Sequence, residues 1–146
     1  MSVWQKLYDE LRDNNFIVIA VAMDARADAA RSWIENAAPS YPALIDRDHR
    51  LSELYNMVNV PQAVWIDEAG RIVRPAENAG AFEAFRSLNF ETMTVPEGKQ
   101  QTAAAAKATY VQAVRDWVLS GKDSGHVFDA EQARAHTALP SAEIAQ

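Results

Sequence analysis

The apolar run at residues 16–23 constrains the fold more than any other part of the sequence. Every side chain in it is apolar, several are β-branched, and no polar residue interrupts it. A strand with one solvated face shows apolar and polar residues in alternation, so this run predicts a strand covered on both faces, as in a parallel sheet. Asp24 follows the run directly and ends the strand with a carboxylate.

Asp24 has two interpretations. In α/β folds ligands bind outside the carboxyl ends of the strands, which makes Asp24 a candidate functional carboxylate. Capping of the following helix explains an aspartate at this position equally well. Both interpretations stay open at the level of sequence.

Helical and extended patterns alternate on either side of this strand. Before it, apolar residues recur at helical spacing from Val3 to Leu11, and Ser2 is suited to cap that helix. After it, we expect a helix at 28–36, an extended piece at 41–45 and a short helix at 51–55. This alternating order predicts an α/β sandwich.

A β-hairpin is predicted next. Residues 63–67 and 71–74 have the composition of strands, and Glu68, Ala69 and Gly70 join them. Gly70 is placed where a tight turn needs a positive φ, which favours antiparallel pairing of the two strands.

The second half of the sequence is helical in character. We expect helices at 81–88 and 101–119, a turn at 94–98, a helix that Asp129 caps and that runs through 138, and the entry to another at 139–141. The chain therefore divides into an α/β part at 1–75 and a helical C-terminal extension at 76–146, packed on or beside it.

Four tryptophans fall on the apolar faces of predicted elements. They are Trp4, Trp33, Trp65 and Trp117. Large aromatic side chains at such positions are more often part of a core than a stacking platform for a ligand, so we expect all four in the core.

The net charge of the chain limits the classes of partner that it can bind. A formal net charge of -6 and a pI of about 5.0 argue against nucleic acid, whose binding needs clustered Lys and Arg. No apolar run reaches the roughly 20 residues of a membrane helix. Residues 1–6 lack the apolar core of a signal peptide, which leaves the compartment open between the cytoplasm and a bacterial extracytoplasmic space.

The chain contains no cysteine, which excludes thiolate nucleophiles, disulfides and thiolate metal sites within it.

Its three histidines are His49, His126 and His136. They lie far apart, without the spacing of metal ligands on one helix face. Asp46 and Asp48 lack the pattern of a calcium loop and are better interpreted as a turn that caps the helix near Leu51. We expect neither a metal nor a cofactor.

Residues 58–73 carry a more specific signal. Val60 and Pro61 close a loop that leads into an apolar strand, an Asp-x-x-Gly-Arg turn beginning at Asp67, and a last strand. This arrangement resembles the thioredoxin fold, and most closely the TlpA/ResA branch of thiol–disulfide oxidoreductases, in which the bond before that proline is cis. With the upstream elements, the resemblance covers roughly residues 2–75.

The resemblance implies a thioredoxin-like α/β/α sandwich whose substrate is an extended peptide or a disulfide-containing protein. In such a fold the backbone N–H and C=O of Val60 hold the substrate by strand addition beside Pro61. Gln62 is next to that pair and can contact the peptide. A peroxiredoxin-like protein, with a single peroxidatic cysteine, is the nearest variant.

The chain departs from this family at the family's functional centre. Members carry Cys-x-x-Cys at the start of the helix that here begins near Ser2, because a helix N-terminus lowers the pKa of a thiol. By that comparison Met1 falls inside the active-site helix. We therefore expect an N-terminally truncated oxidoreductase or, as the alternative, a cysteine-free module that binds peptides or proteins through the groove at Pro61 and the C-terminal helices. Either is redox-inactive as it stands.

The absent first strand has a structural consequence. In the thioredoxin fold it lies between the strands equivalent to 16–23 and 63–67, so its absence leaves a gap of two strand spacings, roughly 10 Å. Unpaired strand edges invite new pairing. We predict that these two strands pair directly or that the chain forms a homo-oligomer through them.

Overall fold

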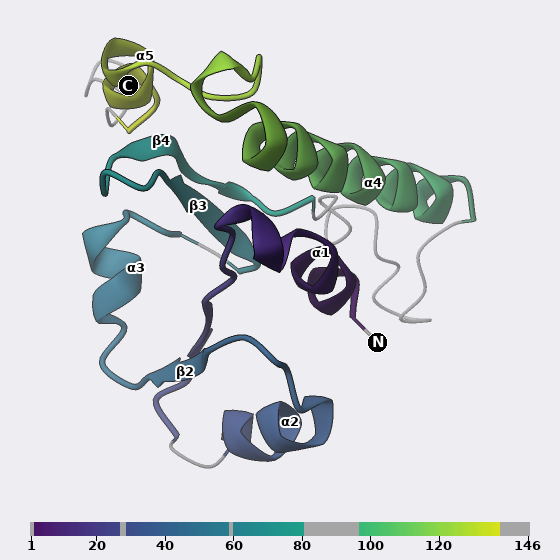
Figure 1. Cartoon of the computed structure of the whole chain (residues 1–146). Coiled ribbons are helices and arrows are strands. Elements are labelled where there is room, and N and C mark those ends of the chain that lie inside the picture. The colour runs from purple at the N-terminus through teal and green to yellow at the C-terminus, as the bar shows by residue number, and fades with distance from the viewer. Residues whose placement is uncertain (1, 27–28, 59, 81–96, 138–146) are drawn as a thin grey trace.

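The computed structural model describes residues 2–26, 29–58, 60–80 and 97–137 (Figure 1). Helices and strands alternate through the first half, and helices make up the second. The helices are α1 (Val3–Leu11), α2 (Ala29–Ala37), α3 (Arg50–Leu54), α4 (Glu97–Ser120) and α5 (Ala130–Thr137), with 3-10 turns η1 (Arg12–Asn14) and η3 (Gly121–Asp123). The strands are β1 (Ala20–Met23), β2 (Ala43–Asp46), β3 (Gln62–Ile66) and β4 (Ile72–Asn78).

Local signals in the sequence place most of these elements. The Ser2 side chain accepts a 3.1 Å hydrogen bond from the backbone N–H of Gln5 and caps α1. Asp129 caps α5 in the same way, with a 2.8 Å bond from the N–H of Gln132. Gly70 has a φ of 76° in the turn between β3 and β4, which pair antiparallel as predicted.

Three bounds differ most from the predictions. β4 continues to Asn78, beyond the predicted end at 74, because its ladder with β3 continues to the pair of Gln62 and Asn78. β1 begins only at Ala20, because the ladder with β2 starts there. α4 begins at Glu97 and includes Gly98, which the sequence predicted in a turn. A single glycine costs a helix only about 1 kcal/mol, and the alanine-rich sequence that follows offsets it. The helix predicted at 81–88 and the helix entry at 139–141 lie outside the described residues.

The strands form two separate sheets. β1 pairs in parallel with β2, from Ala20 opposite Ala43 to Met23 opposite Asp46, and β3 pairs only with β4 within the described ranges. The predicted direct pairing of β1 with β3 is therefore wrong. Each strand pairs instead with a strand close in sequence, across a short crossover or a hairpin, which costs the least loop-closure entropy.

The sheet of β1 and β2 has a helix on one face. A cavity of about 460 Å³ between α1, α2 and this sheet is lined by Trp33, Ile34, Ala20 and Ala43, among others, which places α2 over the alanine face. Side chains alternate along a strand, so Ile19 and Leu44 point away from Ala20 and Ala43. They are 57% and 53% exposed. The expectation of a strand covered on both faces is thus wrong for the start of the run at 16–19, whereas all four residues of β1 are half-buried.

The core lies where α1, β3 and α4 meet. Its most buried members are Leu7, Leu11, Trp65, Val111 and Val114. Between Leu11 and Trp65 no described residue is buried. The buried residues thus lie at one end of the molecule. Figure 1 shows α4 along α1 and the hairpin at that end, and β2 and α2 at the opposite end.

Three of the four tryptophans belong to this core as predicted. Trp65 is buried, and Trp4 and Trp117 pack against the cluster. Trp33 is 77% exposed, so its predicted burial is wrong. Its helix α2 has no buried residue, because it faces a sheet surface of small alanine side chains.

Contacts join the two segments into which we divided the chain. The core contains Leu7 from the first segment and Val114 from the second. The Arg115 guanidinium also forms two 2.7 Å hydrogen bonds to the Glu10 carboxylate, which hold the pKa of Glu10 below its ordinary value.

Of the helices that the structure describes, none combines the length and apolar character needed to span a bilayer.

Candidate peptide-binding site

The site that the sequence singled out lies at the start of β3. Val60 and Pro61 form the end of the loop from α3, and Gln62 is the first residue of the strand. The Val60–Pro61 peptide bond is cis. Both loop residues are exposed, with Val60 at 65%, so this loop lies at the surface.

Backbone hydrogen bonds to other described residues hold Pro61 in this loop but not Val60. The C=O of Pro61 accepts a 3.3 Å bond from the N–H of Ala79, just beyond β4. Among the described residues, the N–H and C=O of Val60 take part in no hydrogen bond. An exposed residue with both backbone groups unpaired is what strand addition requires.

Gln62 adds an acceptor beside this backbone. Its side-chain Oε1 is buried and accepts no hydrogen bond from any described residue. A buried polar atom without a partner costs about 1–3 kcal/mol, and such atoms are rare in folded proteins. A donor brought to this place by another molecule would remove that cost. Val60, Pro61 and Gln62 are neighbours in the chain, and their role in binding stays a prediction.

Asp24 is not joined to this site. Its Oδ1 accepts a 2.9 Å hydrogen bond from the backbone N–H of Arg26, which closes a turn ahead of α2. Helix α2 itself begins at Ala29, so Asp24 stabilises the turn and does not cap the helix. Within the described ranges, no hydrogen bond or ion pair connects Asp24 with Val60, Pro61 or Gln62.

Other carboxylates near strand ends also have local roles. Asp46 at the end of β2 accepts a 2.7 Å bond from the N–H of Leu51, which confirms the predicted capping role and lowers the pKa of Asp46. Asp67 accepts bonds from the backbone and side chain of Arg71, and these lower the pKa of Asp67. No group of three or more metal-ligating side chains occurs in the part of the chain that the structure describes.

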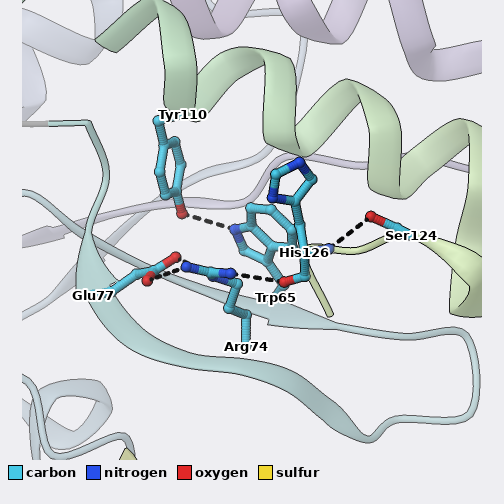
Figure 2. A network of polar contacts seen from close by, with 6 residues as sticks. All are labelled: Trp65, Arg74, Glu77, Tyr110, Ser124 and His126. Carbon is cyan, nitrogen blue, oxygen red and sulfur yellow. Dashed lines mark hydrogen bonds and ion pairs between the residues drawn. The ribbon is translucent and has the colours of Figure 1, made fainter. Parts of the chain in front are cut away.

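Trp65 in β3 is held by Tyr110, a residue that the sequence analysis did not single out (Figure 2), and by Trp117, which it placed in the core. Its indole N–H donates a 2.7 Å hydrogen bond to the hydroxyl of Tyr110 in α4. Its ring stacks on Trp117 with centroids 4.9 Å apart. Burial raises the pKa of Tyr110 to about 12, although the bond from Trp65 acts in the opposite direction.

Arg74 in β4 connects the hairpin with the chain after α4. It makes a two-bond ion pair with Glu77, at 2.6 and 2.9 Å, and donates a 2.7 Å bond to the C=O of His126. Its guanidinium also lies over the rings of Trp65 and Phe128. Sequence reasoning missed Arg74 because its partners lie up to 52 residues away, and an arginine within a strand carries no signal for them.

The chemistry available at the site is binding. The chain has no cysteine, so none of its residues supplies a thiolate for attack on a disulfide. An exposed backbone with unpaired N–H and C=O groups can add an extended strand, and the Gln62 amide can accept one further bond.

The alternating helices and strands, with a cis X-Pro loop leading into an antiparallel hairpin, agree with the class of thioredoxin-like redoxins, and the family match shows that class. Residues 1–74, just over half of the chain, match the model of the AhpC/TSA family, and the chain belongs to that family. No curated protein and no solved structure gives a significant match. The matched segment includes Val60, Pro61 and Gln62, whereas α4 and α5 follow it.

Proposed function

We propose that this chain is the substrate-binding part of a thiol–disulfide oxidoreductase of the TlpA/ResA type. It binds extended segments of disulfide-containing proteins along Val60, Pro61 and Gln62. The thiols that exchange with the substrate disulfide lie outside these 146 residues, because the sequence has none. The chain's own part is to hold and orient the peptide.

The buried Oε1 of Gln62 beside the unpaired backbone of Val60 carries this proposal. Two backbone groups and one side-chain acceptor lie on consecutive residues at an exposed strand start. An extended peptide offers N–H and C=O groups at a matching repeat, so one segment can pair with both backbone groups of Val60, and it reaches the Gln62 amide when that side chain turns its Oε1 outward. Membership of the redoxin class makes a protein substrate the expected ligand.

The other candidates from the sequence have less support. Asp24 is left out of the site because, within the described residues, no hydrogen bond or ion pair links it to Val60, Pro61 or Gln62. A docking module built from the C-terminal helices draws no support from the family match, which ends at residue 74.

Peptide binding tests the proposal. The probe is a fluorescein-labelled ten-residue peptide of Val and Thr around one Cys, which carries a mixed disulfide with glutathione. We expect saturable binding by fluorescence anisotropy. The same peptide with N-methylated backbone amides cannot donate to the strand, so we expect it to bind at least about tenfold more weakly, equivalent to 1.4 kcal/mol.

A side-chain variant locates the binding. Gln62→Met keeps the length of the side chain and removes its acceptor, so we expect weaker binding of the probe. The matched control is Gln112→Met on the exposed face of α4. Equal affinity of Q62M, Q112M and the unaltered chain, or equal affinity for the two peptides, would reject the proposed site.

A further inference from the structure

Helix α4 lies against the strand ends that carry the proposed site. The C=O of Pro61 is bonded to the N–H of Ala79, and Ala79 is only 7% exposed. The position of Pro61 therefore depends on where the chain leaves β4. The next residue along that chain is Gly80, which touches α4.

Gly80 meets α4 at the distance of backbone contact. A Cβ on Gly80 would lie 2.9 Å from the Cα of Lys107 and 3.0 Å from the Cβ of Tyr110. Both atoms belong to the rigid part of the helix, so neither can turn aside. Gly80 also has a φ of 67°, a value that L side chains rarely adopt. Only glycine satisfies both conditions.

Tyr110 contacts the hairpin a second time. While its Cβ faces Gly80, its hydroxyl accepts the 2.7 Å hydrogen bond from Trp65 in β3. One residue of α4 thus fixes the chain after β4 and the far half of β3. Gln62 lies between these two anchor points, opposite Asn78 in the ladder.

We propose that α4, which follows the segment matched to the family, is a brace that positions Val60, Pro61 and Gln62 for peptide binding through Gly80 and Tyr110. This inference rests on the proposed function. Gly80 and Tyr110 are positioning residues that act through Pro61 and Trp65 and do not themselves touch the peptide.

The test compares two glycines that share a backbone conformation and differ in their surroundings. Gly80→Ala adds a methyl group against α4, whereas Gly70→Ala adds it at a φ of 76° with no atom within 4 Å. We expect G80A to bind the glutathionylated probe peptide at least about fivefold more weakly, because a displaced binding loop loses affinity steeply, and G70A to change it less than about twofold.

A stability control separates positioning from general weakening of the fold. Val114→Ala removes core packing from the same helix without touching Gly80. If loss of stability alone weakened binding, V114A and G80A would weaken it equally whenever their unfolding midpoints are equal. We expect V114A to retain its affinity for the probe peptide.

A nuclear magnetic resonance measurement distinguishes failure of the brace from failure of the proposed function. The side-chain amide of Gln62 should shift in G80A and keep its position in G70A, without any peptide present. If the unaltered chain does not bind the probe, the proposed function fails, and this shift still decides on the brace. An unchanged Gln62 signal in G80A, or G80A binding as tightly as G70A, overturns the brace.

Discussion

The indole N–H of Trp65 donates a 2.7 Å hydrogen bond to the hydroxyl of Tyr110, 45 residues later in the chain. The bond joins the hairpin of the family-matched segment to a helix that follows it. Trp65 is 4% exposed, so this N–H cannot exchange the hydroxyl for water without local opening. The pair therefore connects the stability of the hairpin with the docking of α4.

Removing the Tyr110 hydroxyl should destabilise the chain. Tyr110→Phe keeps the ring and leaves the buried N–H of Trp65 without an acceptor, which costs about 1–3 kcal/mol of unfolding free energy. Urea unfolding followed by tryptophan fluorescence measures the change. Tyr8→Phe is the control, because no hydrogen bond of the Tyr8 hydroxyl occurs among the described residues. Similar stability of both variants would show that the bond contributes little.

The same hydroxyl should make the chain less stable in strong alkali. The pKa of Tyr110 is about 12 when folded against an ordinary 10.0, so the folded chain retains this proton where the unfolded chain loses it. The stabilisation is complete below pH 10 and is lost as the pH rises through about 12. An absorbance titration at 295 nm should show a late tyrosine step that Tyr110→Phe removes; an unchanged titration contradicts the burial of this hydroxyl.

The sequence could predict the elements but not how they pack. Ser2, Asp129 and Gly70 act within a few residues of themselves, so their roles follow from local patterns. Trp33 and Trp65 look alike in sequence, yet one is exposed and the other buried. Their difference depends on α4, which covers the hairpin and not α2.

The residues of the candidate site also differ in whether the sequence could predict them. Val60, Pro61 and Gln62 are consecutive, so a sequence motif is enough to find them. Gly80 and Tyr110 could not be found, because their importance arises from an approach between backbones distant in sequence. No composition or periodicity encodes such a contact.

Arg74 should hold the chain between α4 and α5 on the hairpin. Arg74→Met removes the bond to the C=O of His126, and we expect the N–H of Phe128, bonded to Val73 in β4, to exchange its hydrogen about tenfold faster. Arg71→Met is the control, because the bonds of Arg71 to other described residues stay within its own turn. Equal exchange rates of the Phe128 N–H in both variants would show that Arg74 does not hold this segment on the hairpin.

Among the described residues β1 pairs only with β2, and its other edge should promote self-association. Residues 16–23 carry no charge or proline, the usual protection of an exposed strand edge, and Ile19 is 57% exposed. We expect the sedimentation coefficient to rise with protein concentration and Ile19→Lys to abolish the rise. Leu54→Lys, at an 80% exposed position in α3, serves as the control. A constant monomeric coefficient at all concentrations contradicts the prediction.

The most direct test of peptide binding at this site follows the backbone and side-chain amides of the unaltered chain by nuclear magnetic resonance while the glutathionylated peptide is added. We expect the largest shifts on the N–H of Val60 and the side-chain amide of Gln62, with smaller ones at Ala79 and Gly80. Shifts centred on the cavity beside Trp33, with Val60 and Gln62 unmoved, would contradict binding at Val60, Pro61 and Gln62.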